Sequence, residues 1–157
     1  MGCGLMMVYR VTTQKRAGDL SGTGAKLYGG RWNPAGYPVI YTSQSSSLAM
    51  LETLVHADQR FLKAKYALTS LEIPDELVPF SIITKDLPPN WDKLPFSYET
   101  QEMGRIWVQD QKKLIMKVPS AVNQYESNFL INPLHGKFLK ISMREAVEFH
   151  FDERFRK

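Results

Sequence analysis

The sequence predicts an α+β fold, in which a mixed β-sheet forms the core and a few helices flank it. Short apolar runs rich in β-branched and aromatic residues outnumber the segments with helical periodicity. The two kinds of segment do not alternate strictly, as they would in a doubly wound fold. The chain has 157 residues, of which 43% are hydrophobic, and this suits one domain with its own core. We place that domain at residues 7–157 and expect residues 1–6 to be a disordered N-terminal extension.

The first third of the chain is predicted to contain two strands and one helix. Apolar residues at 6–11 and 38–42 predict strands, separated by a long loop at 13–30 that is rich in Gly, Ser, Thr and Lys. Serines at 45–47 offer N-caps for a helix that reaches about residue 62. Its apolar positions at helical spacing are expected to face the core: Leu48, Leu51, Leu54, Val55 and Leu62.

The rest of the chain is predicted to add six strands and a second helix. The strands are expected at 66–73, 78–84, 114–118, 128–132, 138–141 and 147–151. A proline-rich loop at 87–91 precedes a helix at 98–111, whose Met103, Ile106 and Trp107 are expected to face inward.

Charge and cysteine usage narrow the range of functions. The net charge of +4 is a mild surplus, which fits an anionic small molecule or an acidic partner about as well as nucleic acid. Because the surplus is mild, we expect no direct nucleic-acid contact. Cys3 is the only cysteine, which favours a reducing, cytoplasmic setting. The sequence has no apolar run of about 18 residues, so no membrane span is expected. The spacing of His56, His135 and His150 is not that of a metal site.

Arg31 and Glu52 are the strongest candidates for chemistry. Arg31 follows Gly29 and Gly30, so its guanidinium is either a fork for a phosphate or a surface charge in a hairpin turn. Glu52 lies at the edge of the apolar stripe of its helix, with no Lys or Arg at helical spacing. It is therefore either solvated or paired in space, with Arg31, with Arg10 or with a substrate hydroxyl.

Tyr41 and Ser120 each follow or end a predicted strand. The Tyr41 ring could stack on a heterocycle or belong to an ordinary strand. The Ser120 hydroxyl could bond a ligand or cap a backbone group. Because no base lies near Ser120 in the sequence, a Ser-His-Asp triad has little support.

From about residue 8 to residue 155, the chain resembles the RES-domain toxins of bacterial toxin–antitoxin pairs. Residues 29–33 (GGRWN) are similar to the arginine motif of that family, and residues 39–41 to the strand that follows it. Residues 49–56 resemble the glutamate helix, and residues 118–121 (VPSA) resemble the serine motif. Residues 8–10 and 128–135 are similar to the opening strand and to the segment after the serine.

The resemblance implies a fold similar to that of ADP-ribosyltransferases, with NAD+ as substrate and no further cofactor. It implies cleavage of the nicotinamide–ribose bond, depletion of cellular NAD+ and growth arrest. The implied catalytic residues are Arg31, Tyr41, Glu52 and Ser120. The implied substrate-binding residues are Arg10, Tyr28, Asn33 and Asn128. The implied partner is an Xre-like antitoxin with a helix-turn-helix domain, and homo-oligomerisation stays open.

Three alternatives are kept beside this interpretation. The first is an ADP-ribosyltransferase that modifies a protein target. The second is a ribonuclease toxin, supported by the sequence pI of about 9.2 but not by any His pair. The third is a non-catalytic module that only binds a nucleotide.

Overall fold

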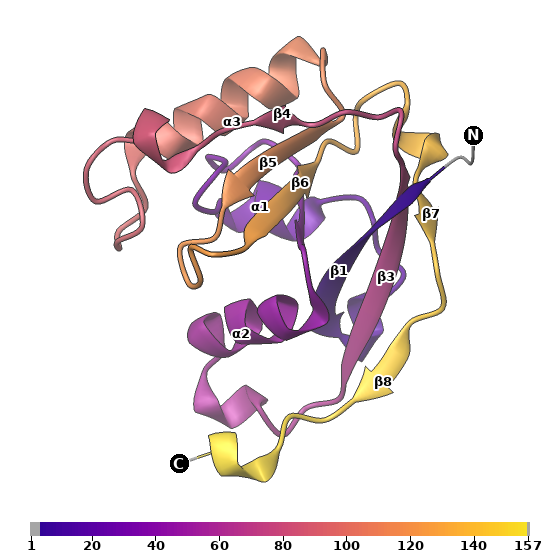
Figure 1. Ribbon diagram of the computed structural model, residues 1–157. Coiled ribbons are helices and arrows are strands. Elements are labelled where there is room, and N and C mark those ends of the chain that lie inside the picture. Colours follow the sequence, from indigo (N-terminus) through magenta and orange to yellow (C-terminus); the bar gives the residue numbers. More distant parts are fainter. Residues whose placement is uncertain (1–3, 157) are drawn as a thin grey trace.

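A computed structural model, which describes residues 4–156, confirms the α+β class (Figure 1). An eight-stranded sheet has the strand order β4-β5-β6-β2-β1-β3-β7, and β8 also pairs with β3. The β4–β5 pair is parallel and the other pairs are antiparallel, so the sheet is mixed. The strands are β1 (Leu5–Thr13), β2 (Ile40–Ser43), β3 (Tyr66–Pro74), β4 (Phe80–Ser81), β5 (Ile115–Pro119), β6 (Ser127–Ile131), β7 (Ser142–Met143) and β8 (Val147–Phe149). The α-helices are α1 (Thr23–Tyr28), α2 (Ser46–His56) and α3 (Tyr98–Asp110).

Three apolar clusters hold these elements together. One lies around Val8, Ile40 and Leu71, and a second joins α3 to the sheet through Trp107, Met116 and Leu130. The third packs α2 and the C-terminal segment through residues that include Leu62, Tyr66 and Phe151. Complete burial of one such side chain contributes about 1.5–3 kcal/mol to folding, so α2 and α3 are fixed mainly by these contacts.

Strand direction explains how segments far apart in the sequence meet. Strands β2 and β5 both run antiparallel to β6, so they are parallel to each other and end at the same edge of the sheet. Ser43 of β2 and Val118 of β5 both pair with Asn128. Helix α2 begins directly after β2, and the turn that contains Ser120 follows β5. The glutamate helix and the serine turn therefore emerge side by side.

The N-terminal part of the chain is more ordered than we predicted. Strand β1 begins at Leu5, so residues 5 and 6 belong to the sheet; residues 1–3 lie outside the described residues. The predicted loop at 13–30 contains the helix α1. Its last carbonyls are satisfied from outside the helix, since Asn33 Nδ2 donates to the carbonyl of Ala25 and the Gly36 N–H to that of Lys26.

The inward faces of both helices were predicted wrongly in part. Leu51 and Val55 of α2 are 40% and 55% exposed, and Ile106 of α3 is 51% exposed. Leu48 and Leu54 face inward as predicted, and Met50, which was not predicted to face inward, joins Leu54 against the cluster around Leu62. Helix α2 ends at His56, before the predicted end at about residue 62.

Two predicted strands were also wrong in extent or kind. Residues 138–141 form a 3-10 turn over Phe138–Lys140, and the short strand β7 follows it. The predicted strand at 78–84 is reduced to the two residues of β4, at the edge of the sheet. None of the helices between residues 4 and 156 has the length and apolar character that a membrane span requires.

Candidate active site

Arg31 lies at the tip of a tight turn that glycine makes possible. The Gly30 N–H donates to the Asn33 carbonyl at 2.9 Å, and the Asn33 N–H donates back at 3.4 Å. A Cβ atom on Gly30 would lie 2.6 Å from the hydroxyl of Tyr41, too close for any side chain. Gly29, at φ +73°, has the left-handed conformation that glycine adopts readily. The two glycines thus let the turn close against β2.

One edge of the Arg31 guanidinium is held by the loop before α3. Its Nη1 donates to the carbonyls of Trp91 at 2.6 Å and Lys93 at 3.0 Å, and its Cζ lies 5.1 Å from the ring centroid of Phe96. Among residues 4–156, no hydrogen-bond partner is found for Nε or Nη2. Burial lowers the pKa of Arg31, while the negative charge of Glu52 acts in the opposite direction. The free edge of this guanidinium can accept an anion.

Tyr41 and Asn33 fix the shape of the arginine turn, which is the tight turn of residues 30–33 around Arg31. The Tyr41 hydroxyl donates to Asn33 Oδ1 at 2.6 Å and accepts from the Trp32 N–H at 3.1 Å. Burial raises the pKa of Tyr41. Asn33 is 0% exposed, and its amide nitrogen also donates within the protein, to the carbonyls of Ala25, Pro34 and Tyr37. This geometry favours a positioning role for both residues, and stacking of the Tyr41 ring on a ligand stays a prediction.

Glu52 is held by Ser120. Ser45 caps α2 by accepting from the Leu48 N–H, and Glu52 lies two turns along the helix, where its Oε1 accepts from Ser120 Oγ at 2.7 Å. Ser120 Oγ itself accepts from the N–H groups of Val122 at 3.1 Å and Asn123 at 3.0 Å.

These contacts fix the direction of the serine proton. A hydroxyl has two lone pairs and one proton, and both lone pairs of Ser120 face backbone N–H groups. Its proton must therefore point at Glu52. Since Ser120 is 0% exposed, the structure favours the second of its predicted roles, in which it caps a turn and orients the carboxylate.

Arg31 and Glu52 are neighbours without being bonded to each other. The charge of Glu52 acts on the pKa of Arg31, yet no ion pair within the described part of the chain joins the two. Gln124, just beyond the serine turn, donates to Asp92 Oδ2 at 3.1 Å and links that turn to the loop that holds Arg31. Each side chain thus keeps polar atoms for a third group.

The other predicted binding residues lie in varied surroundings. Tyr28 ends α1 directly before Gly29, and its ring is 80% exposed. Arg10 Nη1 donates to the Asp19 carbonyl at 2.7 Å, and burial lowers its pKa. Asn128 donates to Ser43 Oγ at 3.1 Å. The contacts of Arg10 and Asn128 do not join them to Arg31 or Glu52.

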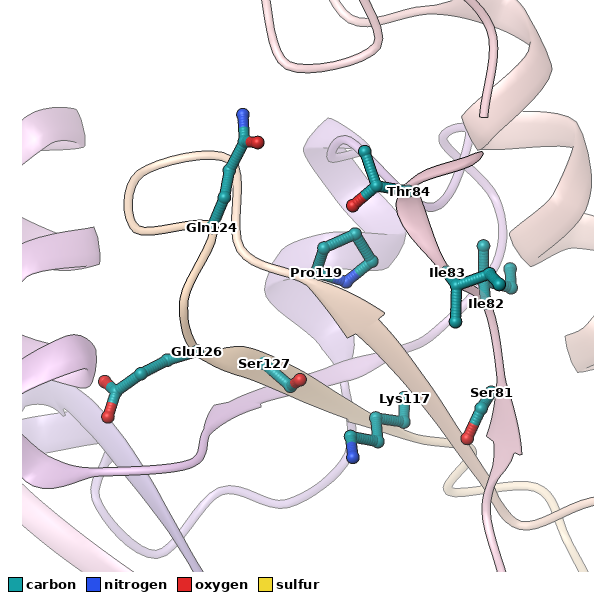
Figure 2. Close-up of a pocket in the computed structure, with 9 residues that line it drawn as sticks. All are labelled: Ser81, Ile82, Ile83, Thr84, Lys117, Pro119, Gln124, Glu126 and Ser127. Atoms are coloured by element: carbon teal, nitrogen blue, oxygen red, sulfur yellow. The ribbon is translucent and has the colours of Figure 1, made fainter. Parts of the chain in front are cut away.

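A hollow of about 380 Å³ lies beside the serine turn (Figure 2). Its wall includes Pro119, Gln124 and Ser127, together with Ser81 and Lys117 of the neighbouring strands. Arg31, Tyr41 and Glu52 do not line it, so it is separate from the cluster of candidate catalytic residues. Nor is any group of three or more His, Cys, Asp or Glu within residues 4–156 placed to hold a metal ion.

The main contacts of the guanidinium could not be found from the sequence. Trp91 and Lys93 bind Arg31 through their carbonyl oxygens. Every residue has such an oxygen, so no residue type marks the contact. Phe96 offers only the weak signal of an aromatic residue in a proline-rich loop.

The chain is similar to known proteins over nearly its whole length. The family model for the RES domain matches residues 7–152. The chain is 39% identical to "Toxin Res" of Photorhabdus laumondii subsp. laumondii, over 95% of this chain and 96% of that protein. It is 36% identical to "Prs ADP-ribosylating toxin" of Sphingobium sp., over 93% and 94%.

Two further similarities involve mycobacterial proteins. "NAD(+) phosphorylase MbcT" of Mycobacterium tuberculosis is 36% identical over 74 residues, which are 43% of this chain and 39% of that protein. The crystal structure of the M. tuberculosis MbcT–MbcA toxin–antitoxin complex matches with a TM-score of 0.79, covering 94% of this chain and 86% of that chain. At 23% identity, this last match shows a shared fold.

Proposed function

This chain belongs to the RES domain family, and from that membership we propose that it is a toxin that degrades NAD+ by cleaving the nicotinamide–ribose bond. The names of two relatives support the substrate: one is an ADP-ribosylating toxin and one an NAD+ phosphorylase. Both reactions begin by breaking the same bond and differ only in the group that receives ADP-ribose. The shared first step is therefore the part that we assign to this protein.

The observation that carries the proposal is the Glu52 carboxylate, fixed by a 2.7 Å hydrogen bond from Ser120. When the C–N bond breaks, its electron pair leaves with nicotinamide as a neutral ring, so no strong general acid is needed. The ribose becomes an oxocarbenium-like cation in the transition state, as in glycoside cleavage. Ionised Glu52 stabilises that charge, and such a preorganised group contributes about 3 kcal/mol.

Arg31 would grip the pyrophosphate with the edge that the loop leaves free. Its Nη1 is fixed by the carbonyls of Trp91 and Lys93, so the remaining donors are already oriented before the substrate arrives. Tyr41 would hold the turn and offer its ring to nicotinamide or ribose, and the exposed ring of Tyr28 could stack as well. Arg10 is a second candidate for the phosphates.

The acceptor of ADP-ribose is water, phosphate or a protein side chain. Water or another protonated acceptor would release a proton to solvent as its bond to the ribose forms, whereas an ionised phosphate oxygen has none to lose. We further propose that an Xre-like antitoxin restrains the protein and that it acts in the cytoplasm. A toxin–antitoxin complex with the same fold supports the existence of a protein partner. A ribonuclease is less favoured, because the candidate site contains no histidine.

The proposal can be tested by exposing NAD+ to the purified protein, with and without phosphate and cell extract, and identifying the products by mass spectrometry. We expect free nicotinamide from the wild type and a loss of at least about 100-fold in Glu52→Gln, with the fold retained. Glu72→Gln is a matched control, because Glu72 pairs with Arg144 where β3 meets β7. Saturable NAD+ binding without nicotinamide would identify a binding module, and cleaved RNA would identify a ribonuclease.

A further inference from the structure

Helix α3 meets the arginine turn through three successive backbone carbonyls. Gln101 Nε2 donates to the Gly30 carbonyl at 2.9 Å. Thr100 Oγ1 donates to the Arg31 carbonyl at 2.7 Å. The Trp32 carbonyl lies so close to the helix that a Cβ on Gly104 would be 1.5 Å from its oxygen. The backbone of the turn is thus seated on the helix residue by residue.

The three contacting residues share one face of α3. Residues 100, 101 and 104 lie within about 100° of one another on a helix of 3.6 residues per turn. Thr100 is 0% exposed, and its hydroxyl also lies 3.0 Å from the carbonyl of Ser97, the N-cap residue of its helix. One face of α3 therefore offers two hydrogen-bond donors, Thr100 and Gln101, and at Gly104 the space left by the absent side chain. This face fits the backbone of the turn.

The segment directly before α3 holds the other end of Arg31. Trp91 and Lys93 accept from its guanidinium, and Phe96 lies under it. The rings of Trp91 and Trp32 also pack with their centroids 6.0 Å apart. One continuous stretch, residues 91–104, therefore fixes both the backbone and the charged end of this arginine.

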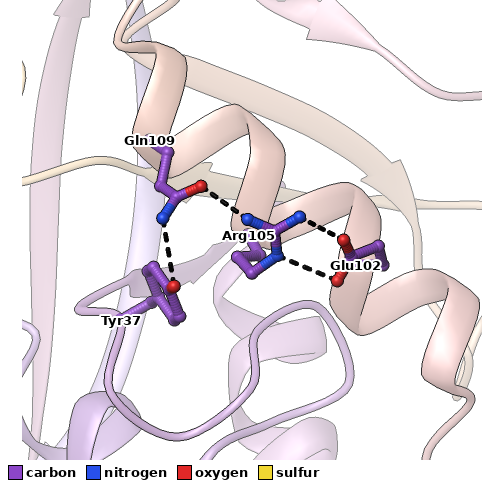
Figure 3. A network of polar contacts seen from close by, with 4 residues as sticks. All are labelled: Tyr37, Glu102, Arg105 and Gln109. Carbon is purple, nitrogen blue, oxygen red and sulfur yellow. Dashed lines mark hydrogen bonds and ion pairs between the residues drawn. The ribbon is translucent and has the colours of Figure 1, made fainter.

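Helix α3 is itself docked on the loop after the turn (Figure 3). Gln109 donates to the hydroxyl of Tyr37 at 3.1 Å and accepts from Arg105, which forms an ion pair with Glu102. Arg105 and Gln109 of this network lie beyond the residues that touch residues 30–32, in the second half of the helix, and Glu102 lies between Gln101 and Gly104. The network gives the helix a fixed place against the loop that is independent of Thr100 and Gln101.

We propose that Thr100 and Gln101 are positioning residues for Arg31 in the NAD+ reaction; this inference rests on the proposed function. Their hydrogen bonds fix the peptide groups on both sides of the Arg31 Cα. The guanidinium lies at the end of a long side chain, so small rotations of the turn become large displacements of the charge. A misplacement of about 1 Å at a reacting centre can reduce the rate about 100-fold.

The test compares substitutions that keep shape but remove the donor. Gln101→Met and Thr100→Val are expected to lower kcat/KM for nicotinamide release about 2- to 12-fold, the effect of losing one hydrogen bond of ordinary strength. Thr100→Ser keeps the hydroxyl and is expected to stay within about threefold of the wild type. Gln14→Met removes an amide that donates to Glu148 on the surface, away from α3 and the turn, and is expected to stay within about twofold.

A double-mutant cycle separates positioning from general destabilisation. In an Arg31→Ala background, Gln101→Met is expected to add less than about twofold, because the residue that it positions is gone. The same cycle is measured as NAD+ affinity in the Glu52→Gln background, so it does not depend on residual turnover. Equal losses with and without Arg31 would overturn the positioning role.

Measurements on the wild-type protein distinguish a failure of the proposed function from a failure of the positioning role. A folded wild-type protein that neither binds NAD+ nor releases nicotinamide refutes the proposed function. An active wild type whose Gln101→Met and Thr100→Val variants keep full activity refutes only the positioning role.

Discussion

Replacing Ser120 with alanine would remove three hydrogen bonds at one buried point. One is the donor to Glu52 at 2.7 Å, and the others are the bonds that Ser120 Oγ accepts from the N–H groups of Val122 and Asn123. A hydrogen bond to a charged group contributes about 1.5–3 kcal/mol. If that contribution is fully expressed in the transition state, kcat/KM falls about 10- to 150-fold.

The substitution has a second signature in stability. The two orphaned N–H groups would also lower the free energy of unfolding by about 1–3 kcal/mol, which denaturant titration measures.

Ser97 provides a matched control for this experiment. Its Oγ accepts from the N–H groups of Glu99 and Thr100, two and three residues later, and donates to the carboxylate of Glu99. The bonding pattern is that of Ser120, but the carboxylate is on the surface. We expect Ser97→Ala to lower kcat/KM less than Ser120→Ala does, because the carboxylate that Ser97 contacts, Glu99, is not a candidate catalytic group. The reasoning is refuted if Ser120→Ala lowers kcat/KM no more than Ser97→Ala does.

Three further changes have distinct expected outcomes. Arg31→Ala should raise KM and lower kcat together in steady-state assays, because one residue binds and orients; unchanged values would remove Arg31 from the site. Gly104→Ala forces a Cβ against the Trp32 carbonyl and should lower the free energy of unfolding by about 1–3 kcal/mol. An unchanged midpoint in denaturant titration would contradict this. Burial raises the pKa of Tyr41, so the unfolded state releases this proton first, and stability should fall as pH rises above about 10. Melting temperatures between about pH 9 and 11 should show a smaller fall in Tyr41→Phe, and equal slopes would contradict this.

The longest strands of the sheet could be predicted because their sequence pattern is local. Residues 66–73 alternate and residues 6–11 are largely apolar, and the two segments form the long β1–β3 pair. Helix α1 could not be predicted, because its carbonyls are capped by Asn33 and Gly36 from the following loop. The orientation of α2 was ambiguous, because Leu51 and Val55 compete with Met50 and Leu54 as an apolar stripe.

Part of the candidate site could likewise be predicted from the sequence, and part of it could not. Arg31, Tyr41, Glu52 and Ser120 could be singled out by residue type and motif order. The hydrogen bond from Ser120 to Glu52 depends on which strand ends share a sheet edge. The hydrogen bond from Tyr41 to Asn33 depends on how the turn around Arg31 folds back on β2. Sheet order is a property of the assembled chain, so one sequence does not disclose it.

The serine proton at the end of β5 has a single destination, and this affects when the protein is ready to act. Its hydroxyl already faces Glu52, so under the proposed function no hydrogen has to be rearranged before NAD+ binds. The carboxylate would then be oriented for the reaction at all times. A partner that restrains the proposed activity would have to cover Glu52, and activity would begin once that cover is removed.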